Sequence, residues 1–152
     1  MSTYRATIDW RLEGDFKSRR YSRAHALHFD GGLTIAGSSS PQVVPLPWSR
    51  EGALDPEAAF TAAIASCHML WFLDLASRAG FVVEGYRDAA EGTLAKGADG
   101  RVQMTRVVLR PNAGFAGPRH PTAAELADLH HRAHEECFIA NSVKTEIVVE
   151  PA

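Results

Sequence analysis

The chain contains two cysteines, and each has a setting in which a thiol could do redox chemistry. Cys67 lies in the middle of an apolar stretch, and Cys137 lies at the end of a more polar one. A thiolate can attack a peroxide oxygen, become a sulfenic acid and condense with a second thiol to form a disulfide. An attacking and a resolving cysteine are therefore one interpretation. The other is an inert Cys67 that packs as a small hydrophobic side chain.

A reactive Cys67 would need a positive charge beside it. Burial raises the pKa of an isolated thiol, and position 67 lies well beyond the first helical turn, where the helix dipole could lower it. His68 is a poor candidate, because it points about 100° further round the helix. Other candidate cations come from the N-terminal part of the chain: Arg19, Arg20, Arg23 and His25. Glu57 complements the helix dipole, and its carboxylate could also hold an arginine in a bidentate pair.

A rival cluster lies in the second predicted helix. His130, His134 and Cys137 fall at i, i+4 and i+7 on one helical face, and histidine with cysteine suits zinc. Position 131 is histidine, however, and not the glutamate that marks zinc proteases. Because two histidines on a polar helix face are more often solvated, we favour a site without a metal.

A long helix from Asp55 to Gly80 has to position Cys67. Asp55 can cap its first turn, Pro56 suits the first helical position, and Gly80 offers a left-handed stop. Apolar residues on nearly every side predict a helix that is covered on most faces. Its length and the charged residues near its end argue against a membrane span.

Alternating apolar and polar residues predict strands around this helix. The predicted strands are residues 4–12, 21–29, 33–36, 81–86, 90–94, 102–109 and 144–149. Long loops are predicted for 37–54 and 111–121, and the capping-box spacing of Thr122 and Glu125 predicts a helix from Ala123 to Glu136. The fold class is α+β, with antiparallel strands around a long buried central helix in one domain, 1–152. A single sheet covers only one face of that helix, so we expect an obligate homodimer with the helices at its interface.

The composition excludes several classes of function. The chain has 152 residues, of which 45% are hydrophobic, which is typical of one soluble domain. A net charge of −2 without a basic run argues against nucleic-acid binding. The N-terminus lacks the pattern of a signal peptide, so a cytoplasmic location is expected, where a purely structural disulfide is rare.

Two segments of the sequence resemble the OsmC/Ohr family of osmotically inducible and organic hydroperoxide resistance proteins. The first is PEAAFTAAIASCHMLWFL at 56–73, and the second is ECFIANSV at 136–143. The family's ten-residue spacing from glutamate to cysteine is reproduced by Glu57 and Cys67. The likeness covers roughly residues 20–150.

The resemblance implies an intertwined α+β homodimer with two active sites at its interface. It also implies a thiol-dependent peroxidase that reduces organic hydroperoxides without metal, haem or flavin. By the same resemblance, Cys67 is the peroxidatic and Cys137 the resolving cysteine, Arg23 (or, second, Arg20) stabilises the thiolate, and Glu57 positions the arginine. A dithiol is the implied reductant, and lipoyl groups on partner proteins serve many family members.

Phe138 stands where the family often has a proline, and the 38–54 loop differs from typical Ohr members. These features indicate an OsmC-like subgroup. Apolar walls from Phe60, Ile64 and Trp71 would favour an alkyl or fatty-acyl hydroperoxide. The alternative is a non-catalytic module that senses redox state or binds a lipid-like ligand.

The ten residues between Glu57 and Cys67 span about 15 Å of a straight helix, too far for one arginine to reach both with ease. Either the helix is broken near Thr61, or the Arg23–Glu57 pair comes partly from a second subunit.

Overall fold

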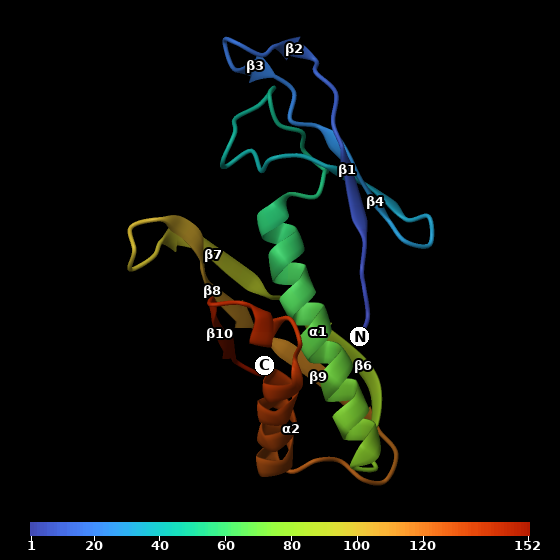
Figure 1. The fold of residues 1–152 in the computed structure, drawn as a ribbon. Coiled ribbons are helices and arrows are strands. Elements are labelled where there is room, and N and C mark those ends of the chain that lie inside the picture. The colour runs from blue at the N-terminus through green and yellow to red at the C-terminus, as the bar shows by residue number, and fades with distance from the viewer. The chain divides into compact units, whose positions relative to one another are not determined.

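The computed structural model describes all 152 residues and divides into two compact units, Met1–Ala59 and Phe60–Ala152. The first is the N-terminal unit, and the second is the C-terminal unit (Figure 1). Whether the two form the single expected domain, 1–152, stays a prediction.

The N-terminal unit is built from short antiparallel strands. They are β1 (Ala6–Asp9), β2 (Gly14–Asp15), β3 (Arg20–Tyr21), β4 (His25–Phe29) and β5 (Thr34–Gly37). β1, β4 and β5 form one sheet in the order β1-β4-β5, and β2 pairs with β3. Gly37 is opposite His25 in the β4–β5 register, and a Cβ on it would come within 2.4 Å of the His25 ring and of Leu27. This close approach requires glycine at position 37.

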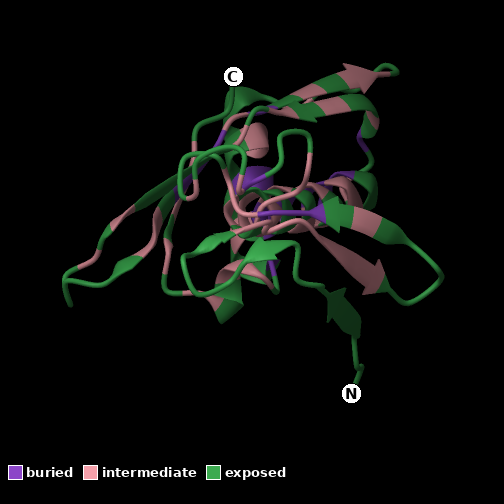
Figure 2. Ribbon diagram, turned by 90° about the horizontal axis from the view of Figure 1, so that it is seen from above, coloured by how far each residue is buried: buried purple, intermediate pink, exposed green.

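The strands predicted for 4–12 and 21–29 are shorter in the structure. β1 is four residues long and exposed along its whole length, not half-buried (Figure 2). The second predicted strand is interrupted between Tyr21 and His25, because the Ser22 and Arg23 N–H groups donate to the carbonyls of Glu13 and Trp48. Because these two N–H groups are already paired, they cannot donate to a neighbouring strand of the sheet, and β4 begins only at His25.

The C-terminal unit holds most of the regular structure. Its elements are α1 (Pro56–Arg78, whose first residues lie in the N-terminal unit), β6 (Val82–Asp88), β7 (Glu91–Lys96), β8 (Val102–Leu109), β9 (Pro111–Ala116), α2 (Ala123–Glu136), a 3-10 turn (Ala140–Ser142) and β10 (Glu146–Val149). One sheet has the order β10-β8-β7, and a second pairs β6 with β9. β10 runs parallel to β8, whereas β7 and β8 are antiparallel.

The structure differs from the sequence prediction at residues 111–121, where a loop was expected. β9 occupies the first part of this segment and pairs with β6. Pro111 is its first residue, which is a position where a strand tolerates proline. The prediction of α2 is confirmed, including its capping box: the Glu125 N–H donates to Thr122 Oγ1 over 3.2 Å, and the Thr122 N–H donates to Glu125 Oε2 over 2.8 Å.

The buried residues of α1 lie on one face, at the spacing of a helical stripe: Ile64, His68, Phe72, Leu75 and Ala76. Leu70, on another face, is 60% exposed. Within one chain, α1 is therefore not covered on most of its faces, which differs from the prediction. By length and composition α1 could also cross a membrane, but a helix in the core of a soluble protein passes the same test.

Two clusters of buried residues hold this unit together. In the first, Phe72 and Leu75 of α1 pack with Leu129 and Ala133 of α2. In the second, Ile64 packs against β8 residues. Since α2 lies alongside α1 (Figure 1), the packing of the two helices fixes how their cysteines face each other.

Candidate active site

The two cysteines are neighbours in the C-terminal unit. Both are free thiols, and they lie close enough together for Cys67 to raise the pKa of the Cys137 thiol. Cys67 comes from the middle of α1 and is partly exposed, whereas Cys137 caps the C-terminus of α2 and is 1% exposed. The structure therefore brings the predicted attacking and resolving thiols together in their reduced form.

A local hydrogen-bond network fixes the Cys137 thiol at the end of α2. The backbone of Cys137 leaves helical form, with ψ at 110°. The Ala140 N–H then donates to Cys137 Sγ over 3.3 Å. Asn141 closes the turn, because its N–H donates to the Cys137 carbonyl over 3.0 Å and its side-chain Nδ2 donates to the Glu135 carbonyl over 2.8 Å.

The surroundings of Cys137 keep it protonated. Burial raises the pKa of the Cys137 thiol to about 11, the neighbouring Cys67 adds to the rise, and the Ala140 N–H opposes it. At neutral pH Cys137 is therefore a thiol and not a nucleophilic thiolate. This state suits a residue that acts second, after its neighbour.

A buried pair of histidines links the two helices beside the cysteines. His68 Nε2 and His130 Nδ1 are 3.1 Å apart, and the two side chains are 1% and 4% exposed. The His130 ring also stacks on Phe72, with centroids 4.4 Å apart. Burial lowers the pKa of both imidazoles to about 4, with a contribution at His68 from His130. At neutral pH both rings are uncharged, so one donates to the other.

Sequence reasoning missed this pair, because it considered His68 only as a cation for Cys67 and His130 only as a zinc ligand. The spacing of Ile64, His68 and Phe72, four residues apart on one helical face, is the signal that could have placed His68 in the core.

The zinc alternative at His130, His134 and Cys137 finds no support in the structure. His130 is hydrogen-bonded to His68, and the Cys137 sulfur accepts the Ala140 N–H. Nowhere in the 152 residues does a group of three or more His, Cys, Asp or Glu side chains lie where it could hold a metal ion.

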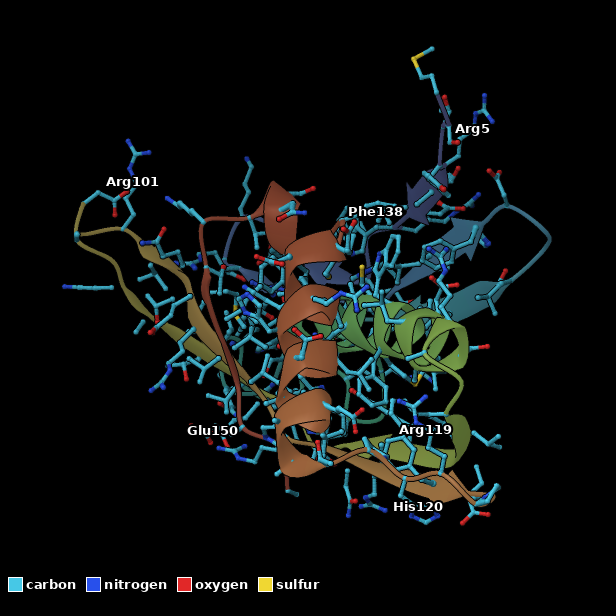
Figure 3. All side chains as sticks on the ribbon, turned by 90° about the horizontal axis from the view of Figure 1, so that it is seen from below. Arg5, Arg101, Arg119, His120, Phe138 and Glu150 are labelled. Atoms are coloured by element: carbon cyan, nitrogen blue, oxygen red, sulfur yellow. The ribbon has the colours of Figure 1, made fainter.

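Exposed apolar side chains lie next to the cysteines. Trp71, one turn after Cys67, meets Phe138 edge to face, with ring centroids 5.4 Å apart. Phe138 is 67% exposed and lies at the C-terminal end of α2, whereas Arg119 and His120 precede the opposite end (Figure 3). Together with the exposed Leu70, these two aromatic rings give the surface near Cys67 an apolar character.

One of the three predicted apolar walls, Ile64, belongs to the core instead. Ile64 is fully buried, and it packs with Val107 and Leu109 of β8. Phe60 is partly buried against the same cluster. Ile64 has no exposed surface to offer a substrate. Of the three predicted residues, Trp71 is the one that packs against Phe138.

Arg23 lies in the N-terminal unit, where its guanidinium is held in place. Its Nη1 donates to the Arg19 carbonyl over 3.0 Å and to the Tyr21 carbonyl, and its Cζ lies 3.7 Å from the centroid of the Tyr21 ring. It lines a hollow of about 330 Å³ together with Ile8, Trp10, Phe16, Tyr21, His25 and Ser39. Arg20, the second candidate, is exposed on β3.

Glu57, in the first turn of α1, also belongs to the N-terminal unit. The pairing of Arg23 with Glu57 and with the Cys67 thiolate therefore stays a prediction. One of the two alternatives for this pairing, a break in the helix near Thr61, is wrong, because α1 runs without interruption from Pro56 to Arg78.

The family profile described as OsmC-like protein matches residues 49–152. The chain belongs to the OsmC-like family. An OsmC-like protein of unknown function from Vibrio cholerae is 49% identical over the whole of both chains, and its structure is similar with a TM-score of 0.98. A search of curated proteins found no match.

More distant members share the fold of this OsmC-like protein. An organic hydroperoxide resistance protein from Elizabethkingia anophelis and OhrB of Bacillus subtilis are each 19% identical, with TM-scores of 0.70. Each alignment covers 99% of this chain, and it covers 94% and 98% of theirs. The predicted family and the α+β fold of OsmC/Ohr proteins are thus confirmed.

Proposed function

We propose that this OsmC-like protein is a thiol-dependent peroxidase that reduces organic hydroperoxides. The observation that carries the proposal is the proximity of the partly exposed Cys67 to the buried, protonated Cys137. Peroxide reduction by two thiols needs one thiol that the peroxide can reach and a second thiol close enough to react with the sulfenic acid that forms on the first.

The chemistry follows in three steps. The Cys67 thiolate attacks the terminal peroxide oxygen, the O–O bond breaks, and the alkoxide leaves as an alcohol after gaining a proton. The Cys137 sulfur then attacks the Cys67 sulfenic acid, and water leaves as the disulfide forms. A dithiol reduces the disulfide, and a lipoyl group on a partner protein is a reductant of this kind.

Arg23 and Glu57 complete the proposed site. An arginine is always charged, so it can stabilise both the Cys67 thiolate and the departing alkoxide. The stacking of Arg23 on Tyr21 supports this role, because it holds the guanidinium in one orientation. Glu57 would position the arginine, partly across subunits, since α1 has no break that would shorten the distance.

The proposed substrate is an alkyl or fatty-acyl hydroperoxide. The exposed Leu70 and Phe138 and the partly buried Trp71 near Cys67 support this choice, because an apolar tail gains free energy when it leaves water.

The proposed assembly is a homodimer in the cytoplasm. The apolar residues that one chain leaves exposed on its strands, such as Ile8 of β1 and Leu94 of β7, support a partner surface. A stable monomer in sedimentation at micromolar concentration would contradict the dimer.

The test is steady-state turnover of cumene hydroperoxide with dithiothreitol as the reductant. The wild-type chain and a Ser66→Ala control should turn over, because Ser66 is an exposed neighbour of Cys67. Cys67→Ser should be inactive. Cys137→Ser should accumulate a sulfenic acid on Cys67 that dimedone traps. If the wild-type chain consumes no organic hydroperoxide, the proposal is wrong.

The second candidate is a non-catalytic module that senses redox state or binds a lipid-like ligand. The hollow of about 330 Å³ lined by Trp10, Phe16 and Tyr21 favours it, because ligand sites are typically apolar, with a few polar groups such as Arg23. Stoichiometric oxidation of Cys67 without turnover would select this function.

A further inference from the structure

We propose that the reductant attacks the sulfur of Cys67 and expels Cys137, so that the mixed disulfide of the reductive half-reaction forms on Cys67. The inference deepens the proposed peroxidase function and rests on it. It assigns the two sulfurs of the disulfide different roles: Cys67 is the point of attack, and Cys137 is the leaving group.

The exposure of the two residues carries the inference. In thiol–disulfide exchange the attacking thiolate must reach the sulfur, so access decides which sulfur reacts. Cys137 is 1% exposed, whereas Cys67 is partly exposed. A second subunit can only add cover, so the burial of Cys137 holds in any assembly. The route that admits a peroxide to Cys67 is equally open to a small dithiol.

The turn after α2 keeps Cys137 covered. The Cys137 carbonyl and sulfur each accept a backbone N–H, from Asn141 and Ala140. The Ser142 hydroxyl donates to the Phe138 carbonyl over 2.6 Å, and Phe138 packs on Trp71. Exposing the sulfur of Cys137 to a nucleophile would require this turn to open.

The raised pKa of Cys137 acts against its role as the leaving group. A thiolate of high pKa leaves slowly, and burial raises the pKa of Cys137. The Ala140 N–H counters this effect, because it already donates to the sulfur on which the negative charge develops. Access is the larger effect, since the alternative attack needs several hydrogen bonds of the turn to break first.

Atoms and electrons are conserved in this exchange. The reductant's first thiolate forms an S–S bond with Cys67, the Cys67–Cys137 bond breaks, and the electron pair stays on Cys137, which takes up a proton. The reductant's second thiolate then attacks its own sulfur in the mixed disulfide and releases the Cys67 thiolate. The dithiol is oxidised by two electrons, and the protein disulfide is reduced by two.

The test separates the two sulfurs with a monothiol, which stops at the mixed disulfide. The wild-type chain is oxidised with diamide, mixed with limiting 2-mercaptoethanol and quenched in acid at increasing times. Peptide mapping by mass spectrometry then locates the adduct. We expect at least a roughly ten-fold excess of adduct on Cys67 at the earliest times, because access controls the rate. An adduct mainly on Cys137, equal amounts on both, or no disulfide after diamide would overturn the proposal.

Two controls connect the result to the fold. In urea the preference should vanish, because unfolding exposes both sulfurs equally. Ser142→Ala removes the hydroxyl that ties the turn to Phe138, so the share of adduct on Cys137 should increase. An unchanged preference in urea would show that burial is not its cause.

Because diamide forms the disulfide without a peroxide, this inference and the proposed function can fail separately. A chain that carries the adduct on Cys67 but consumes no hydroperoxide refutes the peroxidase and leaves the regiochemistry intact. A chain that turns over hydroperoxide with the adduct on Cys137 refutes the regiochemistry alone.

Discussion

The buried pair of His68 and His130 should make the stability of this protein fall as the pH falls from 7 to 4. Both imidazoles lie between α1 and α2, and each has a pKa of about 4 in the folded chain. In the unfolded chain the same groups titrate near the ordinary value of 6.5. The unfolded state therefore binds more protons in this range.

The magnitude follows from proton linkage. A histidine with a lowered folded pKa contributes its full stability above the unfolded pKa and loses it as the pH falls toward the folded pKa. With values of about 4 and 6.5, one such imidazole lowers the free energy of unfolding by about 2 kcal/mol between pH 7 and pH 5. The loss is complete about one pH unit below the folded pKa of about 4, where both states are protonated.

The assay is urea unfolding followed by circular dichroism at several pH values between 7.5 and 4.5. The comparison variant is the double substitution His68→Leu with His130→Phe, which replaces both hydrogen-bond partners by apolar groups. Its free energy of unfolding should change less over this range. A matched control is His131→Gln, because His131 is an exposed histidine of the same helix that pairs with Glu135. Its pH dependence should equal that of the wild-type chain.

The reasoning is refuted if the double variant and the wild-type chain lose the same free energy between pH 7 and pH 5. That outcome would mean that carboxylates elsewhere, and not the buried imidazoles, cause the acid sensitivity. His130→Phe alone should destabilise at neutral pH, by about 1–3 kcal/mol, because it leaves His68 Nε2 buried without its partner.

Three further predictions concern stability and reactivity. Thr122→Ala removes the capping box of α2 and should lower the free energy of unfolding by about 1 kcal/mol in urea titrations, whereas Thr3→Ala, before the first strand, should not. Gly92→Ala should cost about 1–3 kcal/mol in the same assay, because its Cβ would come within 2.3 Å of a threonine hydroxyl on α1. Gly85→Ala is the control, since its Cβ meets nothing within 4 Å, and equal losses would contradict the steric argument. In the reduced chain, the rate at which iodoacetamide alkylates Cys137 should be low at pH 8 and increase toward pH 11, because the pKa of this thiol is raised. Peptide mapping measures the modification. Fast modification at pH 8 would contradict a protonated, buried thiol.

The sequence determined the helices and the family of this protein. The caps of α1 and α2 are local signals, because Asp55, Thr122 and Glu125 bond to backbone groups within three residues of themselves. The spacing of Glu57 and Cys67 is also readable from the chain, and it led to the family that the comparisons confirm.

The sequence could not determine contacts between distant segments. The parallel pairing of β10 with β8 and the strand that begins at Pro111 depend on partners far along the chain. The same holds for Ile64, whose burial against β8 made it a core residue and not a wall of the site.

Cys67 and Cys137 show the division most clearly. Their types and their places in two helices suggested an attacking and a resolving thiol, with an inert Cys67 as the alternative. Their proximity, and the burial of one but not the other, came from the packing of α1 against α2 and from the turn at residues 138–142. Sequence patterns report the faces of a helix, but tertiary packing decides which faces meet and which sulfur stays within reach of solvent.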